Sequence, residues 1–372
     1  ILASGFILIL VVVGVLGSGG GDQPSTKEQT ISIWSPFEEG AAYDQLVAPL
    51  IADSPELKFN FKFIKADSAK DYEAKVVNAI AGGFGPDIWL IRSDWLPKHR
   101  TKLAPSTVNW ASSRRGGSQE QLLGKMPQAV IDQNTFDGRL YGVPLATDTL
   151  ALYINTKVIN EVREELSEAR SNEEALLETE PTTWAELERW SRLITRRLGA
   201  GFSRSGLALG TVANSYAPVD VFSGLLNANN GRLFEKDGSV GLHLASERGG
   251  QTVYPGQETL DFYTSFAVSA HPNYSWNANS GDPVAKFVEG RVGLLIGWQG
   301  LENDFRRLNK DFDRYKVVAL PQPEVVGPTT PRRDLAVYWT NVVPKSSTNP
   351  DLAWRLLQGL LTKGNLSQFA DN

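Results

Sequence analysis

Two aspartates, one of which directly precedes a tryptophan, are the first residues in this sequence whose types suggest chemistry. Asp94 directly precedes Trp95, and Asp148 lies in the stretch 137–155. A carboxylate accepts hydrogen bonds from hydroxyl groups, and an indole ring offers a flat apolar surface, so the combination suits a polyhydroxylated ligand such as a sugar. Asp94 and Asp148 are also the kind of carboxylate pair that glycoside hydrolysis requires. The residues alone leave binding and hydrolysis both open.

Signatures of other chemistry are missing from the sequence. It contains no H-E-x-x-H, G-x-S-x-G or G-x-x-x-x-G-K-[ST] motif, and its histidines (His99, His243 and His271) have unrelated spacings. With no cysteine, neither disulfides nor thiolate metal sites can form. We therefore expect no catalytic residues, no metal and no cofactor.

Composition indicates a folded protein of two domains. The 372 residues are 41% hydrophobic and 21% charged, which is a normal globular balance. A net charge of −5 and a pI near 5.5, without a basic cluster, argue against nucleic-acid binding. The 10 tryptophans are many for this length and favour stacking surfaces for a ligand.

The N-terminal segment suggests where the protein works. Residues 1–17 are an uncharged apolar run, which predicts a membrane anchor or a signal segment. Residues 18–30 are polar and glycine-rich, as in a flexible tether. Because the sequence does not begin with Met, we expect it to be incomplete there, and with no cysteine after the apolar run a lipid anchor is excluded. We expect an extracytoplasmic protein, either tethered to the membrane or secreted.

The first hundred residues of the body predict an α/β unit. Strand-like runs at 31–34, 57–64 and 86–91 alternate with helical patterns, which is economical for a parallel sheet. Ligands of such sheets bind beyond the C-terminal ends of the strands, where Trp34, Asp94 and Trp95 fall. An alternative role for Asp94 is to cap a following helix.

The stretch 137–155 predicts a passage of the chain between two lobes. Asp137-Gly138 is a turn signal, a strand follows over 139–143, and Pro144 removes a hydrogen-bond donor. A second strand-like run extends over 145–154, so an ordered kink joins two strands. An ordinary hairpin arm is the alternative.

Four motifs resemble those of family 1 extracellular solute-binding proteins, the receptors of ABC sugar importers, and in particular their maltose-binding-protein-like members. One motif lies in the stretch 137–155 and is carried by Asp137, Gly138, Tyr141, Gly142, Pro144, Asp148, Tyr153 and Asn155. The others are G-x-G-P-D at 83–87, P-T-T-W-A-E-L at 181–187, and the run 287–299 that ends in Trp298-Gln299.

The resemblance implies a two-lobed periplasmic-binding-protein type II fold, α/β in class. Each lobe is expected to hold a mostly parallel sheet flanked by helices, with hinge strands joining the lobes. Lobe 1 would comprise 30–147 and 322–372, and lobe 2 would comprise 148–321, with the return crossing at 318–323. Relatives continue with further helices of lobe 2, which we expect to be missing after Asn372.

The resemblance also implies a ligand site in an interlobe cleft. Asp94 falls where a sugar-hydroxyl acceptor is found, Trp298 where a stacking platform is found, and Tyr338-Trp339 where lobe 1 faces the cleft. The implied ligand-binding residues are Trp34, Asp94, Trp95, Asp148, Tyr216, Asp220, Trp298, Gln299, Tyr338 and Trp339.

The expected function is that of an extracytoplasmic, monomeric receptor that captures a sugar or oligosaccharide and delivers it to ABC permease transmembrane subunits. One alternative is a binding protein for a non-sugar solute such as a polyol phosphate. Another, from a different class, is a tethered glycosidase or a surface-adhesion domain.

Overall fold

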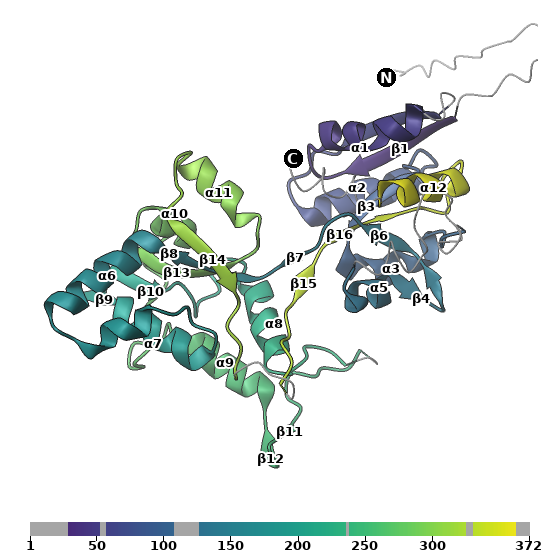
Figure 1. The fold of residues 1–372 in the computed structure, drawn as a ribbon. Helices are drawn as coiled ribbons and strands as arrows, with labels where there is room; N and C mark the ends of the chain where they lie inside the picture. Colours follow the sequence, from purple (N-terminus) through teal and green to yellow (C-terminus); the bar gives the residue numbers. More distant parts are fainter. Residues whose placement is uncertain (1–28, 53–56, 108–125, 236–237, 325–329, 362–372) are drawn as a thin grey trace, which may run out of the picture. The chain divides into compact units, whose positions relative to one another are not determined.

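The structure is a computed structural model that describes residues 29–52, 57–107, 126–235, 238–324 and 330–361. These residues form two compact units (Figure 1). Unit 1 comprises the described residues of Ile1–Ile91, His99–Val143 and Asn341–Asn372, and unit 2 comprises those of Arg92–Lys98 and Pro144–Thr340. The predicted anchor and most of the predicted tether lie outside the described residues.

Unit 1 contains a five-stranded sheet in the order β2-β1-β3-β16-β6. β1 pairs in parallel with both β2 and β3, and α1 and α2 connect these strands, so the predicted β-α-β-α-β unit is confirmed. The strands are β1 (Gln29–Ser35), β2 (Leu57–Phe63), β3 (Ile88–Arg92), β6 (Gly142–Pro144) and β16 (Trp339–Val342), and the longer helices are α1 (Gly40–Ala52), α2 (Ala69–Ala81), α5 (Gln128–Asn134) and α12 (Pro350–Leu360).

Short elements complete this part of the chain. The turn predicted at Asp137-Gly138 joins β4 to β5, and both of its residues have the positive φ (51° and 70°) that such a turn requires. The short elements are η1 (Ser93–Trp95), α3 (Leu96–His99), η2 (Arg100–Lys102), β4 (Thr135–Phe136) and β5 (Arg139–Leu140).

Asp87, the aspartate of the G-x-G-P-D motif, ties unit 1 together. Its buried carboxylate accepts from the backbone N–H and hydroxyl of Ser32 on β1, both at 3.0 Å. The other oxygen accepts from the Ser347 hydroxyl at 2.8 Å and from the N–H and hydroxyl of Thr348. Because an unmatched buried carboxylate is costly, these five donors make Asp87 a structural link between β1 and the segment before α12.

Unit 2 contains a second five-stranded sheet, in the order β14-β8-β13-β10-β9. Only β10 and β13 pair in parallel, whereas β8 is antiparallel to β13 and β14, and β9 is antiparallel to β10. The expectation of a mostly parallel sheet is therefore wrong for this unit, where the sheet is mixed. A two-residue turn joins β9 to β10, and so short a connection permits only antiparallel pairing.

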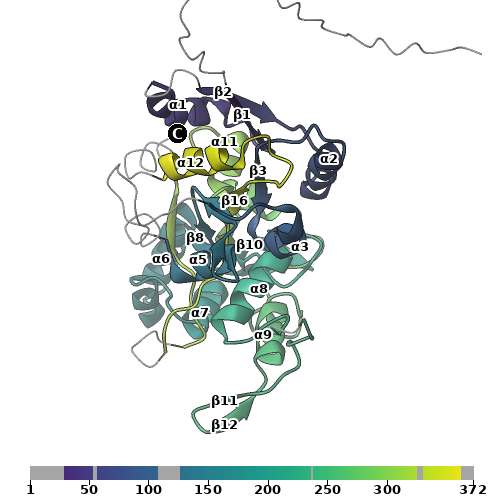
Figure 2. The ribbon, with the colours of Figure 1, turned by 90° about the vertical axis from the view of Figure 1, so that its right-hand side faces the viewer.

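The elements of unit 2 follow one another from β7 to β15. The strands are β7 (Asp148–Thr149), β8 (Ala151–Asn155), β9 (Arg196–Leu198), β10 (Gly201–Leu207), β11 (Ser246–Arg248), β12 (Gln251–Val253), β13 (Val292–Gly297), β14 (Tyr315–Ala319) and β15 (Ala336–Val337). The helices are α6 (Thr156–Glu168), η3 (Asn172–Leu177), α7 (Trp184–Ile194), α8 (Pro218–Ala228), α9 (Pro255–Ser265), α10 (Pro283–Val288) and α11 (Leu301–Leu308). The capping box predicted for α7 is present between Thr183 and Glu186. β11 and β12 form a hairpin that projects beyond α9 (Figure 2).

The boundaries between the units differ in position from the expected lobe boundaries. Residues 318–323 were expected to form the return crossing, but β14 lies at the edge of the sheet of unit 2. Gln322 exchanges backbone hydrogen bonds with Thr182 and Trp184, which keeps this segment on unit 2. The chain returns to unit 1 only after Thr340.

Within the described residues, each helix is too short or too polar to cross a lipid bilayer.

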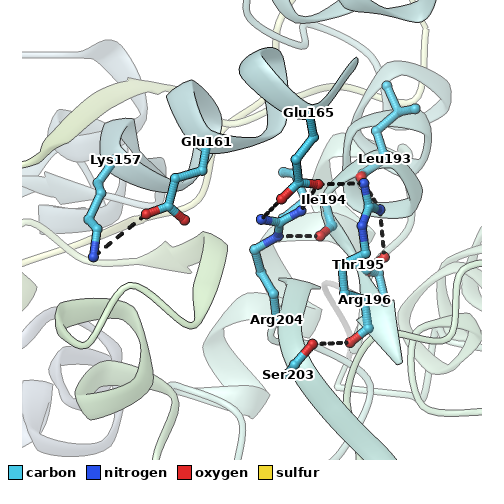
Figure 3. Close-up of polar contacts among 9 residues, drawn as sticks. All are labelled: Lys157, Glu161, Glu165, Leu193, Ile194, Thr195, Arg196, Ser203 and Arg204. Carbon is cyan, nitrogen blue, oxygen red and sulfur yellow. Dashed lines mark hydrogen bonds and ion pairs between the residues drawn. The ribbon is translucent and has the colours of Figure 1, made fainter. Parts of the chain in front are cut away.

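An arginine pair on one glutamate joins four elements of unit 2 (Figure 3). Both oxygens of Glu165 on α6 accept from the guanidinium of Arg204 on β10 at 2.8 Å, and one also accepts from Arg196 on β9 at 2.7 Å. Arg204 is buried and also donates to the carbonyl of Ile194 at the end of α7. The bond to Arg204 is the main reason that the pKa of Glu165 falls to about 2.

Replacement of this glutamate should cost stability in a pH-dependent way. Since the folded state lowers the pKa of Glu165, its contribution is complete above the ordinary carboxyl pKa and is lost as the pH falls toward 2. Glu165→Gln should lower the free energy of unfolding at pH 7 by about 1–2 kcal/mol, a value reduced for the partial exposure of Glu165. Urea unfolding at pH 7 and at pH 3 measures both quantities.

Glu161→Gln is the matched control, because Glu161 lies on the same helix and its one ion pair with a described residue is with the exposed Lys157, at 3.7 Å. Its effect should stay below about 0.5 kcal/mol. Equal losses in the two variants, or a loss for Glu165→Gln that does not shrink at pH 3, would contradict the assignment.

Candidate functional site

Nine of the ten candidate ligand-binding residues belong to unit 2, and only Trp34 belongs to unit 1. Hydrogen bonds and ring contacts divide the nine into two groups. The β13 group comprises Asp148, Tyr216, Asp220, Trp298 and Gln299, and the η1 group comprises Asp94, Trp95, Tyr338 and Trp339. Asp94 was expected on lobe 1, but the structure assigns Arg92–Lys98 to unit 2.

Trp298 is the centre of the β13 group. It follows β13, whose six residues are all buried, so the strand fixes the position at which the indole leaves the core. The Trp298 carbonyl accepts from the buried Tyr153 hydroxyl at 3.0 Å, and the indole N–H donates to Asp220 at 3.1 Å. A half-buried indole with its only polar atom already bonded leaves its ring as an apolar surface.

Asp148 is held beside Trp298 by Gln299, the residue that follows Trp298. The Gln299 N–H donates to both oxygens of the Asp148 carboxylate, at 3.1 and 3.0 Å. β7, which carries Asp148, is kept in place by its antiparallel pairing with β15. Burial raises the pKa of Asp148, although backbone N–H groups of Gln299, Thr149 and Gly300 partly oppose the rise.

Tyr216 completes the β13 group from the loop before α8. Its ring lies against Gly297, where an added Cβ would come within 3.1 Å of a ring carbon. Burial and the negative charges of Asp304, Asp148 and Asp220 raise the pKa of Tyr216 to about 12. The phenol therefore keeps its proton at neutral pH and is a hydrogen-bond donor among carboxylates.

The η1 group is organised by Arg92, a residue that the sequence did not single out. Its guanidinium donates to both oxygens of Asp94, at 3.0 and 3.2 Å, and this bond is the main reason that the pKa of Arg92 rises. The charge of Asp220 contributes to the same rise, so Arg92 connects the two groups electrostatically. Asp94 itself remains exposed.

Two aromatic rings of the η1 group contact each other. The rings of Trp95 and Trp339 meet edge to face with centroids 5.6 Å apart. Tyr338 is buried, and its carbonyl accepts from the Ser93 N–H at 2.9 Å, which fixes η1 against the residue that precedes β16. Trp95 and Trp339 are half-buried and offer ring surface, whereas Tyr338 offers little.

Trp34 is separate from both groups. Its side chain is 8% exposed in the core of unit 1, and the Lys62 ammonium lies 4.1 Å from its ring centroid. Such a ring has little free surface for stacking, so its proposed contact with a ligand has as little support as that of the buried Tyr338.

A cavity of about 470 Å³ elsewhere in unit 2 is a rival location for a ligand. Asn229 and Gln322 in its lining are buried, but their polar atoms already bond within the protein: Asn229 to Arg248 and Pro255, and Gln322 to Leu320 and Arg333. These bonds explain the buried polar groups without a ligand. The part of the chain that the structure describes also holds no cluster of three or more His, Asp or Glu side chains placed to bind a metal.

The two sheets flanked by helices, each in its own compact unit, define a two-lobed periplasmic-binding-protein fold. A family model described as bacterial extracellular solute-binding protein matches residues 34–366. The chain belongs to this family, which consists of binding proteins and not of enzymes, so the glycosidase alternative is not retained.

Individual relatives are distant. A Brucella abortus (strain 2308) protein described as a binding protein is 22% identical over 368 residues, covering 98% of this chain and 79% of the relative. The structure is also similar to an ABC transporter solute-binding protein of Thermotoga lettingae bound to α-D-tagatose (TM-score 0.63, 20% identity, 92% of this chain and 79% of that one). The cyclic α-maltosyl-1,6-maltose-binding protein of Arthrobacter globiformis gives a TM-score of 0.68 at 16% identity, covering 92% and 77%. At these identities the structural matches establish the fold alone.

The raised pKa of Asp148 predicts an unusual response to substitution. Because folding raises this pKa, ionised Asp148 makes folding less favourable, and that penalty grows as the pH rises through the folded pKa. Asp148→Asn removes the charge and keeps an oxygen for the Gln299 N–H, so its stability at pH 7 should equal or exceed that of the wild type. Thermal unfolding between pH 3 and pH 8 tests this expectation.

Asp148→Ala provides the comparison, because it removes the charge together with the acceptor. Leaving the Gln299 N–H without a partner should cost about 1 kcal/mol relative to Asp148→Asn. If both variants are equally destabilised, the carboxylate charge is not a penalty and the pKa assignment is wrong.

Proposed function

We propose that this protein is the extracytoplasmic receptor of an ABC importer and that it binds a neutral sugar or oligosaccharide. The observation that carries the proposal is the β13 group, in which the Trp298 ring lies among oriented carboxylates and a protonated tyrosine. A sugar ring presents an apolar face for stacking and hydroxyl groups for carboxylate acceptors. The structurally similar proteins that bind α-D-tagatose and cyclic α-maltosyl-1,6-maltose support the same class of ligand.

Electrostatics favour a neutral ligand over the polyol phosphate considered above. Asp94, Asp148 and Asp220 supply three carboxylates, whereas the guanidinium of Arg92 is already bonded to Asp94. A phosphate dianion bound beside these two groups would meet like charges, and the arginine of the η1 group already neutralises Asp94, so binding a phosphate there costs free energy. Hydroxyl groups, in contrast, are donors that carboxylates accept readily.

A ligand panel tests the proposal. Maltose, maltotriose, tagatose and glycerol phosphate are added to the purified protein, and the thermal unfolding midpoint is measured. A sugar that binds the folded state raises the midpoint, and the phosphate should not. The sugar should be recovered intact. A midpoint raised by the phosphate and by none of the sugars would overturn the choice of ligand class.

Trp298→Ala should weaken binding of the active sugar by about ten- to a hundredfold, because it removes the stacking surface. Isothermal titration measures the affinity. Tyr254→Ala is the control, since Tyr254 is an aromatic residue of unit 2 that is 50% exposed and belongs to neither group. Equal affinities of the two variants would exclude Trp298 from the site.

Delivery to a permease is the second part of the proposal, and the ABC relative supports it. If it is correct, the sugar-loaded protein should stimulate ATP hydrolysis by its reconstituted transporter several-fold over the sugar-free protein. Equal rates with and without sugar would contradict a receptor role. The membrane tether predicted from residues 1–17 stays a prediction.

A further inference from the structure

Ala217 has a backbone conformation that its position does not explain. Its φ of 38° and ψ of 56° lie in the left-handed region, at the N-cap of α8. The other described non-glycine residues with positive φ are Asp137, in a hairpin turn, and Arg170 and Asn230, each just past the C-terminal end of a helix. Left-handed residues are ordinary at those places and not at the start of a helix.

The conformation is also unfavourable for this residue. A side chain with a Cβ is disfavoured in the left-handed region, and the following Pro218 biases Ala217 toward extended backbone. Glycine would relieve the first cost, and the chain uses glycine at positive φ in nine other described positions. The surrounding structure must therefore impose the conformation.

Contacts on both sides of Ala217 show how it is imposed. Before it, the Asn214 side chain donates to the carbonyl of Asn277 at 2.9 Å, and the Asn214 carbonyl accepts from the Trp276 indole at 3.0 Å. After it, the Ala217 carbonyl accepts from the Val221 N–H at 2.9 Å, which begins α8. The loop and the helix are thus fixed independently, and Ala217 must adopt the φ and ψ values that join the two.

The consequence lies at the end of β13. Tyr216, just before Ala217, lies against Gly297, and Asp220, three residues after it, accepts from Trp298. Gly297, the last residue of β13, is therefore contacted by the residue before Ala217, and Trp298, which follows Gly297, is contacted by a residue after Ala217. A change of φ at Ala217 to a negative value would swing Tyr216 relative to α8, so both contacts could not persist together.

We propose that Ala217 is a positioning residue, whose left-handed conformation places Tyr216 and Asp220 around Trp298 and so sets the shape of the binding surface. The strain at Ala217 is retained because it holds these side chains in one arrangement before ligand arrives. The link to ligand affinity rests on the proposed function, but the link to Trp298 does not.

The test uses the full chain labelled with 5-fluorotryptophan and observed by ¹⁹F NMR without ligand. Comparison with Trp298→Phe assigns the Trp298 resonance. Ala217→Val introduces a β-branched side chain, which strongly disfavours the left-handed region, so it should force φ toward negative values and shift or broaden that resonance. Arg170→Val is the matched control, because it places the same side chain at a left-handed residue that belongs to neither group, and it should leave the resonance unchanged.

Two further variants separate positioning from general destabilisation. Ala217→Asn introduces a residue that tolerates the left-handed region, so it should retain the wild-type resonance. Ala217→Gly removes the side chain that the left-handed region disfavours, so it should also retain the wild-type resonance. Both variants should keep or raise the thermal midpoint, and a Trp298 signal that shifts only in folded Ala217→Val reports the loss of the left-handed conformation.

The outcomes distinguish this inference from the proposed function. An unchanged Trp298 resonance in folded Ala217→Val overturns the inference, whatever the protein binds. A shifted resonance together with an approximately tenfold loss of maltotriose affinity supports both. A shifted resonance in a protein whose wild type binds none of the tested sugars supports the positioning role and contradicts the proposed ligand class.

Discussion

The burial of β13 is the constraint on which the candidate site depends. All six of its residues are inaccessible, and it pairs in parallel with β10 on one side and antiparallel with β8 on the other. A strand held on both edges cannot slip by one residue without moving its side chains to the opposite face. Trp298 and Gln299 therefore leave the sheet at a fixed point, and the Tyr153 hydroxyl from β8 secures the Trp298 carbonyl there. Asp148, Tyr216 and Asp220 are placed relative to this point, each through a contact with residues 297–299.

Much of this arrangement is accessible to sequence reasoning, because it is local. The turn at Gly290 followed by an apolar run predicts a strand that ends near Trp298, and the Asp137-Gly138 turn predicts the hairpin of β4 and β5. The unit 1 strands also follow from alternation and length. Arg92 could not be found in this way. The order I-R-S-D-W does not indicate that its guanidinium donates to Asp94 or that the charge of Asp220 raises its pKa. Gly297 likewise shows its role only when Tyr216, about eighty positions earlier, lies against it.

The places where the sequence misleads share a physical cause. Residues 318–323 were expected to pass between the lobes, because the resemblance to the family implied the return crossing there. In the structure this segment begins in β14, which pairs with β8, and it stays in unit 2, so the passage comes after Thr340. The parallel sheet expected for unit 2 fails for a similar reason. Strand direction depends on which strands become neighbours, and β8 lies between two strands that come more than a hundred positions later in the chain. Periodicity reports that a strand exists but carries no information about its partner.

The three site carboxylates share a property that bears on how a neutral ligand could be bound. Each already accepts at least one hydrogen bond from the protein: Asp94 from Arg92, Asp148 from the Gln299 N–H, and Asp220 from the Trp298 indole. An ionised carboxylate has about four acceptor positions, so these bonds fix its orientation and leave positions for ligand hydroxyl groups. A side chain that is already ordered loses less conformational entropy when a ligand binds. The same bonds therefore hold the carboxylates in the unliganded fold and, at the proposed site, would lower the entropic cost of binding a sugar. If the proposal is correct, the side chains that hold the carboxylates matter as much to the site as the carboxylates themselves.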